Sequence, residues 1–156
     1  MFLEWNFIED GEDFSVVYFA KHLREILASS KEWHMDGTFK TVLRQPRLQQ
    51  LFTIMAIYND QAIPIVFCLM TARTATLYEK IFCHLMENIP NLQQPRNIVS
   101  DYEAAIKAAV WRAFPLARQV GCWFHFAQMI TTILVMEFSI LQKYLTLPYQ
   151  LRNGQI

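Results

Sequence analysis

The order of apolar segments changes halfway along the chain, and this change limits the folds that the chain can adopt. Three strand-like segments rich in β-branched and aromatic residues come first, at residues 33–36, 48–58 and 62–70. Helical and strand-like segments then alternate, over residues 76–88, 98–99, 104–114, 118–122 and 124–145. Antiparallel strands followed by strand–helix pairs predict an α/β domain with a mixed five-stranded sheet, three strands antiparallel and then two parallel, covered by helices on both faces.

The first 30 residues predict a short strand and a helix that lead into this domain. Residues 2–8 are strand-like, and residues 9–13 form an acidic turn. Apolar residues at helical spacing then predict a helix over residues 16–28. We therefore assign residues 1–30 to an N-terminal strand and helix, 31–146 to the α/β domain and 147–156 to a C-terminal tail.

Composition restricts the function classes. The 156 residues are 53% hydrophobic, which suits one domain with a sizeable core. Lys and Arg number 14, as do Asp and Glu, so a chain that handles DNA needs most of its electrostatic attraction from other segments. The three cysteines have no close pair, and the N-terminus carries no secretory signal. The most apolar stretch, residues 129–141, is too short and too polar for a bilayer. These features predict a soluble intracellular protein without a membrane partner.

Two aspartates end apolar strands and are the candidate catalytic residues. Asp36 closes the segment Trp33-His34-Met35-Asp36, and Asp101 follows Ile98-Val99-Ser100. A carboxylate at a strand end sits on a rigid element and faces the open edge of a sheet. Two such carboxylates on adjacent strands would form a site for a hard divalent cation, which is the usual cofactor of phosphodiester chemistry.

Several motifs, in order from about residue 2 to 130, resemble the catalytic domain of Mutator-like element (MULE) transposases. The first is Trp33-x-x-Asp36-Gly37-Thr38-Phe39-Lys40, and the second is Ile98-Val99-Ser100-Asp101-Tyr102-Glu103-x-Ala105. Between them, the hairpin over residues 50–67 and the helix that starts Thr76-x-Tyr78-Glu79 also match. Cys122-Trp123-Phe124-His125 resembles the Cys-x-x-His segment of the family.

The resemblance implies a DDE-type, ribonuclease H-like fold that cleaves DNA and transfers a strand. In that family two aspartates and a distant glutamate bind two Mg²⁺ or Mn²⁺ ions, so Asp36 would bridge the ions and Asp101 would bind one of them. The implied partners are transposon ends and target DNA, and the implied location is the nucleus. The family glutamate follows a long helical insertion, so we expect this domain to be truncated before its third acidic residue and incomplete as a catalyst.

Each candidate also has an ordinary structural interpretation. Asp36 precedes a glycine, which is typical of a turn, and Asp101 could cap the helix that follows it. Cys122 and His125 form only half of a zinc-type spacing, so packing or local ordering is the favoured role for this pair. His34 shares a strand face with Asp36, although a strand histidine more often has a polar neighbour.

Glu137 is the remaining candidate for the third ligand. It falls on the apolar face of the last helix, where a carboxylate needs a partner or a metal. At about 1.5 Å per residue, however, it would lie roughly 20 Å along a helix that leaves the strand ends near Phe124. The distance argues against metal binding by Glu137.

Two other functions fit the same residues. One is a catalytically inactive, transposon-derived domain that acts as a protein- or DNA-associated interaction module. The other is a different metal-dependent nuclease, completed by Glu103 or Glu137. The strongly apolar last helix also predicts a partner, either a second copy of the chain or a missing helical insertion.

Overall fold

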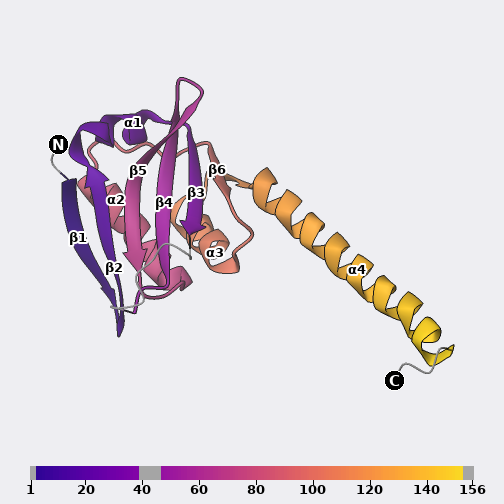
Figure 1. Ribbon diagram of the computed structural model, residues 1–156. Helices are drawn as coiled ribbons and strands as arrows, with labels where there is room; N and C mark the ends of the chain where they lie inside the picture. The colour runs from indigo at the N-terminus through magenta and orange to yellow at the C-terminus, as the bar shows by residue number, and fades with distance from the viewer. Residues whose placement is uncertain (1–2, 39–46, 153–156) are drawn as a thin grey trace. The chain divides into compact units, whose positions relative to one another are not determined.

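The computed structural model describes residues 3–38 and 47–152, with side chains for 4–38 and 47–142. Its contacts divide the chain into two units, Met1–Gly121 and Cys122–Ile156, which are described separately. The first unit contains a seven-stranded sheet with helices packed on it (Figure 1). The predicted domain limits at residues 30/31 and 146/147 stay predictions.

The sheet is mixed and has the strand order β1-β2-β5-β4-β3-β6-β7. The first five strands in this order, β1-β2-β5-β4-β3, are each antiparallel to the next. The last two are parallel: β6 runs parallel to β3, and β7 runs parallel to β6. The strands are β1 (Leu3–Asp10), β2 (Asp13–Ala20), β3 (Glu32–Thr38), β4 (Gln50–Tyr58), β5 (Gln61–Met70), β6 (Asn97–Ser100) and β7 (Arg118–Gly121). The mixed α/β class is confirmed.

Two strands more than predicted belong to the sheet, because residues 3–20 form a β-hairpin. The predicted helix over residues 16–28 is wrong in its first part: β2 runs to Ala20, and only a 3₁₀ turn (Lys21–Leu23) and the short α1 (Arg24–Ser29) follow. Alternate residues Ser15, Val17 and Phe19 are buried, which is the period of a strand. Gly11, with φ +66°, supplies the left-handed residue of the turn before β2.

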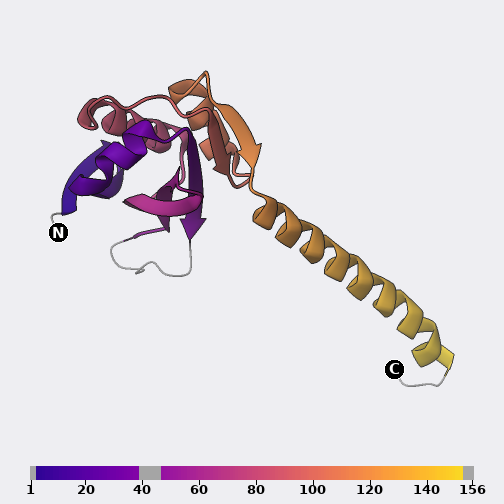
Figure 2. The ribbon, with the colours of Figure 1, turned by 90° about the horizontal axis from the view of Figure 1, so that it is seen from above.

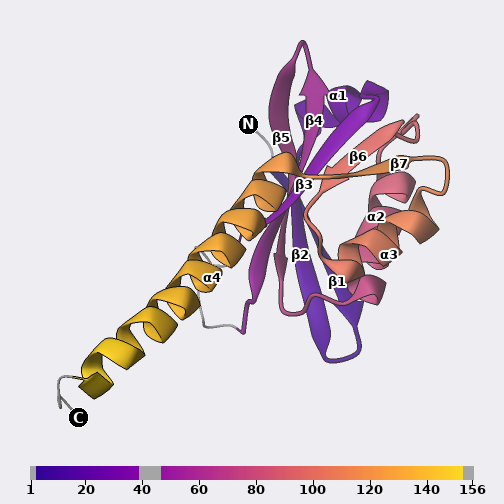
Figure 3. The same cartoon turned by 90° about the vertical axis from the view of Figure 1, so that its right-hand side faces the viewer.

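Helices α2 (Ala75–Asn88) and α3 (Ala104–Ala113) lie together on one face of the sheet, as Figure 3 shows. The N-cap of α2 is Thr74, whose hydroxyl accepts a hydrogen bond of 3.2 Å from the amide of Leu77. The helix therefore begins at Ala75, one residue before the predicted start at residue 76. Residues 104–114 form α3 almost as predicted.

Aromatic side chains fill the space between these helices and the sheet. Trp33 and Phe52 from the sheet, Phe82 from α2 and Phe114 after α3 are almost fully buried. Ring centroids lie 5.3 Å apart for Trp33–Phe114 and for Phe82–Phe114. This core fixes which face of β3 points away from the helices.

The opposite face of the sheet is not covered at β1. Cross-strand partners place Trp5 on the same face as Asp36, through Tyr18, Phe67 and Thr53 in turn. Trp5 is 66% exposed. Within Met1–Gly121, the prediction of helices on both faces therefore does not hold at this end of the sheet.

The second unit is a single helix, α4 (Trp123–Arg152), seen in orange to yellow in Figure 2. It extends seven residues past the predicted end near Leu145 and includes Pro148. Residues Trp123–Gln142 are long and apolar enough to cross a membrane by length and composition alone. The expectation that this part of the chain is too short and too polar for a bilayer is therefore wrong on both counts, although core helices of soluble proteins share both properties.

Candidate functional site

Asp36 lies near the end of β3, on the strand face that points away from the aromatic core. Trp33 and Met35 are buried, whereas His34 and Asp36 are half-buried, because successive side chains of a strand point to opposite faces. Across the antiparallel ladder Asp36 faces Thr53 of β4. The strand therefore holds this carboxylate at the sheet surface, close to the strand's end.

Asp101 follows β6, the parallel neighbour of β3. The ladder pairs Glu32 with Asn97, Trp33 with Ile98 and His34 with Val99. Continuing this register by two residues places Asp101 opposite Asp36. Adjacent strands are about 4.8 Å apart, so this continued register would anchor the two aspartates roughly one strand spacing from each other.

The turn after β6 is held by Asp101 itself. Its Oδ1 accepts a hydrogen bond of 3.0 Å from the amide of Glu103, and its backbone carbonyl accepts one of 3.1 Å from the Ser100 hydroxyl. The N-cap residue of α3 is Glu103, so Asp101 orders the turn in front of the helix rather than capping the helix. An oxygen that orders the turn also fixes the direction of the carboxylate.

Glu103 contacts two other side chains at this edge. The Tyr78 hydroxyl donates to its Oε1 over 3.4 Å, and an Arg73 Nη1 lies 3.8 Å from its Oε2. Burial raises the pKa of Glu103, Arg73 opposes that rise, and the nearby negative charge of Asp101 adds to it. Both oxygens of Glu103 thus already have protein partners.

Tyr78 connects Glu103 to a buried amide. Gln50, fully buried at the start of β4, donates from Nε2 to the Tyr78 hydroxyl and to the Met70 sulfur, the latter over 3.1 Å. Within the described chain the Gln50 Oε1 atom has no hydrogen-bond partner. Burial raises the pKa of Tyr78, so its hydroxyl stays protonated and can donate to Glu103.

His34 has a polar partner on its own strand. Its Nε2 lies 2.9 Å from Glu32 Oε1, and the Asn97 side-chain amide donates to Glu32 Oε2 over 3.2 Å. The hydrogen bond with His34 is the main cause that lowers the pKa of Glu32. His34 thus has the strand-neighbour role that its sequence position favours.

Three sequence candidates lie in the second unit. The Cys122 carbonyl accepts a hydrogen bond of 3.1 Å from the Phe126 amide, in the first turn of α4. His125 lies in that turn, and its ring centroid is 5.8 Å from that of Phe124. Glu137 is exposed on α4, so the expectation that it is buried among apolar neighbours does not hold within this unit.

Among the described residues, no group of three or more His, Cys, Asp or Glu side chains has a geometry that could hold a metal ion. Glu103 was a candidate from the sequence, whereas Gln50, Tyr78 and Arg73 were not candidate site residues. Gln50 carried a usable signal. Strand alternation assigns it to the same buried face as Phe52, and a polar residue there needs a partner.

Comparison with known proteins agrees with the motifs at this sheet edge. The family model described as the MULE transposase domain matches residues 32–129, more than half of the chain. The match includes both aspartates, the Gln50–Tyr78–Glu103 contacts and the Cys-x-x-His segment. No curated protein matches the chain.

Proposed function

The chain belongs to the MULE transposase domain family, and on that premise we propose that its sheet edge catalyses DNA strand cleavage and transfer. A transposase-related function follows from the family. The proposal adds the chemistry, the metal ions and the residues. The observation that supports it most is the parallel register of β3 and β6, which, continued by two residues, would bring Asp101 opposite Asp36.

The donor chemistry of the two aspartates fits Mg²⁺ or Mn²⁺. Both ions prefer oxygen ligands, and Mg²⁺ usually takes one or two carboxylates and completes its shell with water and substrate phosphate. Asp36 would be shared between two ions and Asp101 would bind one. When bound, such ions polarise the phosphate and generate the attacking hydroxide or alkoxide.

Glu103 serves this site by positioning rather than by ligation. Its oxygens are occupied by Tyr78 and Arg73, and its amide holds Asp101 Oδ1 at 3.0 Å. Arg73 also brings a positive charge close to two carboxylates. We infer that these contacts keep Asp101 oriented toward the strand edge when no cation is bound.

The finer fold assignment is part of the same proposal. The strand order β5-β4-β3-β6-β7, with the last two parallel to β3, supports a ribonuclease H-like domain to which the β1–β2 hairpin is added. Transposon ends and target DNA are the proposed partners, and the nucleus is the proposed location. A third acidic ligand is not assigned.

Metal binding tests the proposal most directly. Mn²⁺ is titrated into the full chain and into Asp36→Asn, Asp101→Asn and the double variant, with free Mn²⁺ measured by electron paramagnetic resonance. We expect wild-type binding to weaken at least tenfold in each single variant. Asp60→Asn, in the exposed turn at the opposite sheet edge, is the matched control and should bind as wild type does.

Strand cleavage is the second measurement. Mn²⁺-dependent nicking of plasmid DNA, lost in Asp36→Asn, would support catalysis by this chain. Equal Mn²⁺ binding by the wild type and the double variant would refute the metal site. It would favour the alternative, an inactive transposon-derived interaction module.

A further inference from the structure

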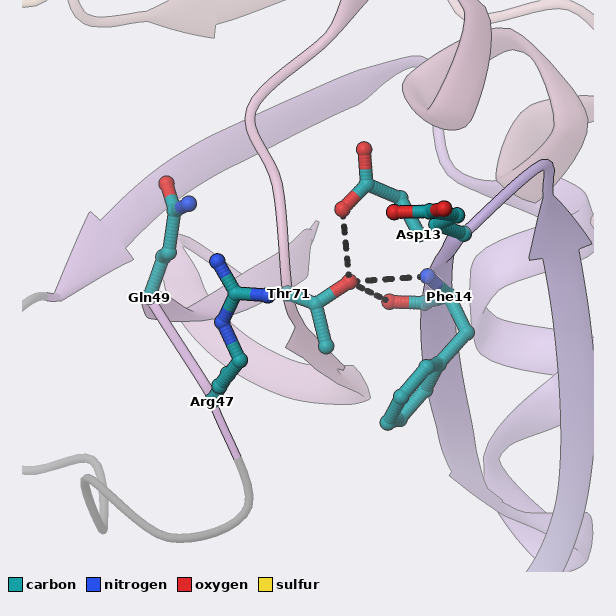
Figure 4. A pocket seen from close by; sticks show the side chains of 6 residues that line it. Asp13, Phe14, Arg47, Gln49 and Thr71 are labelled. Carbon is teal, nitrogen blue, oxygen red and sulfur yellow. Dashed lines mark hydrogen bonds between the residues drawn. The ribbon is translucent and has the colours of Figure 1, made fainter.

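A pocket of about 420 Å³ opens at the sheet edge where Asp36 lies. Glu12, Asp13 and Phe14 border it at the start of β2, Thr71 lies just after β5, and Arg47 and Gln49 precede β4 (Figure 4). The ladders pair Ser15 and Gln50 with Met70, and Leu51 with Thr38. The starts of β2 and β4 and the ends of β5 and β3 therefore share one edge.

Hydrogen bonds hold the pocket wall in place. Thr71 Oγ1 accepts from the Phe14 amide at 2.8 Å, and the Thr71 amide donates to the Phe14 carbonyl at 3.0 Å. The same hydroxyl lies 3.3 Å from Asp13 Oδ1. The Phe14 ring stacks on Phe7 with centroids 4.9 Å apart. The wall is thus ordered before any ligand binds.

The charges of the lining exclude one ligand class and favour another. One guanidinium, of Arg47, faces two carboxylates, of Glu12 and Asp13, so the net charge is negative and a phosphate is disfavoured. Across residues 3–38 and 47–152, no ion pair joins Arg47 to either carboxylate. The pocket suits an uncharged, flat ligand with acceptors on one edge and N–H donors on another.

We propose that this pocket binds an unpaired guanine base of the DNA strand. Figure 4 shows Arg47 and Gln49 on one side of Thr71, with Asp13 and Phe14 on the other. Arg47 and Gln49 suit the O6 and N7 acceptors of guanine, while the Asp13 carboxylate suits its N2–H donor and the Glu12 carboxylate its N1–H donor. A volume of about 420 Å³ is also within the ordinary range for small-ligand sites.

The proposal deepens, and rests on, the proposed DNA function. The pocket lining lies one to three strands from β3 in the sheet order, or roughly 5–15 Å from that strand at the usual strand spacing. Because the carboxylates would take up N1–H and N2–H, which pair with cytosine in a duplex, the base must be unpaired. The pocket would therefore read an unpaired base within a few nucleotides of the phosphate at Asp36.

Nucleosides test the pocket without metal or phosphate. The full ¹⁵N-labelled chain is titrated with deoxyguanosine, deoxyinosine, deoxyadenosine, deoxycytidine and thymidine, and amide signals of Phe14 and Thr71 are followed by NMR. We expect deoxyguanosine to bind about tenfold more tightly than deoxyinosine, which lacks only the N2 amine. Equal affinity for all five nucleosides, or unshifted Phe14 and Thr71 signals, would overturn the proposal.

Two variants separate the two edges of the base. Asp13→Asn keeps an acceptor for Thr71 but replaces the charged acceptor of N2–H by a neutral one, so it should reduce the preference for deoxyguanosine over deoxyinosine. Arg47→Gln, at an exposed position, should lower the affinity for deoxyguanosine and for deoxyinosine by a similar factor. Asp60→Asn is again the control and should bind as wild type. Wild-type selectivity in Asp13→Asn would contradict the assignment, as would inorganic phosphate shifting the same amides.

This result is distinguishable from failure of the metal site. Nucleoside binding uses neither Asp36 nor Asp101, and Mn²⁺ binding uses none of the pocket residues. Loss of Mn²⁺ binding with retained guanine preference would refute the catalytic proposal alone. Retained Mn²⁺ binding without nucleoside selectivity would refute the guanine pocket alone.

Discussion

Tyr78→Phe removes one hydroxyl from the interior of the sheet–helix core and tests whether Gln50, Tyr78 and Glu103 act as a connected set. Gln50 Nε2 would keep only the Met70 sulfur, 3.1 Å away, as an acceptor, and it is fully buried. A buried polar group left without its partner costs about 1–3 kcal/mol. The bond from Tyr78 to Glu103 is long, at 3.4 Å, and adds little. We therefore expect a loss of about 1–2 kcal/mol in the free energy of unfolding.

Urea unfolding followed by circular dichroism measures this loss. With a slope of about 1–3 kcal/mol per molar urea, the midpoint should fall by roughly 0.3–2 M. Tyr58→Phe, at a 47% exposed tyrosine, is the matched control and should leave the midpoint unchanged. Replacing both partners, in Tyr78→Phe/Gln50→Met, should restore much of the stability, because no orphaned amide remains. Equal midpoints for Tyr78→Phe and Tyr58→Phe would refute the reasoning.

Three further predictions concern charge, core and turn. Burial raises the folded-state pKa of Glu103 above its usual 4.5, so between these two pKa values the folded protein binds more protons than the unfolded protein. The free energy of unfolding therefore falls as the pH rises from 4.5 through the folded-state pKa. Glu103→Gln should therefore gain stability relative to wild type between pH 4 and 7 in urea titrations, and a constant difference would contradict this. Trp33→Ala, at a fully buried site, should cost about 3–5 kcal/mol in thermal unfolding, and a loss below about 1 kcal/mol would be inconsistent with the aromatic core. Gly11→Ala places a side chain at φ +66° in open space, so it should cost only about 1 kcal/mol, and an unchanged unfolding midpoint would argue against the left-handed turn.

The sequence predicted the elements whose local signals were strong. The hairpin turn at Asn59-Asp60 is present, with positive φ at both residues, and β3, β6 and α3 lie where the apolar patterns placed them. The hairpin before residue 21 was missed because apolar residues of β2 and α1 together imitate a helical repeat. Periodicity alone could not show that two elements contribute to that repeat.

The site was predictable only as far as strand ends could be recognised. Asp36 and Asp101 follow from the rule that carboxyl ends of parallel strands meet at one edge. The contacts of Glu103 with Tyr78 and Arg73 join segments 25 or more residues apart, and no local pattern encodes them. The pocket beside Thr71 is equally non-local, since β2, β4 and β5 must pair before it exists.

Core-facing and outward-facing side chains alternate along β3, so the direction of Asp36 depends on how its neighbours pack in the core. Trp33 and Met35 anchor one side of the ribbon, and any one-residue slip against β4 or β6 would turn Asp36 inward and bring Met35 outward. A substitution deep in the hydrophobic interior can thus disrupt the proposed catalytic edge while every acidic residue remains intact. Loss of activity in a variant of this protein therefore does not by itself identify a ligand.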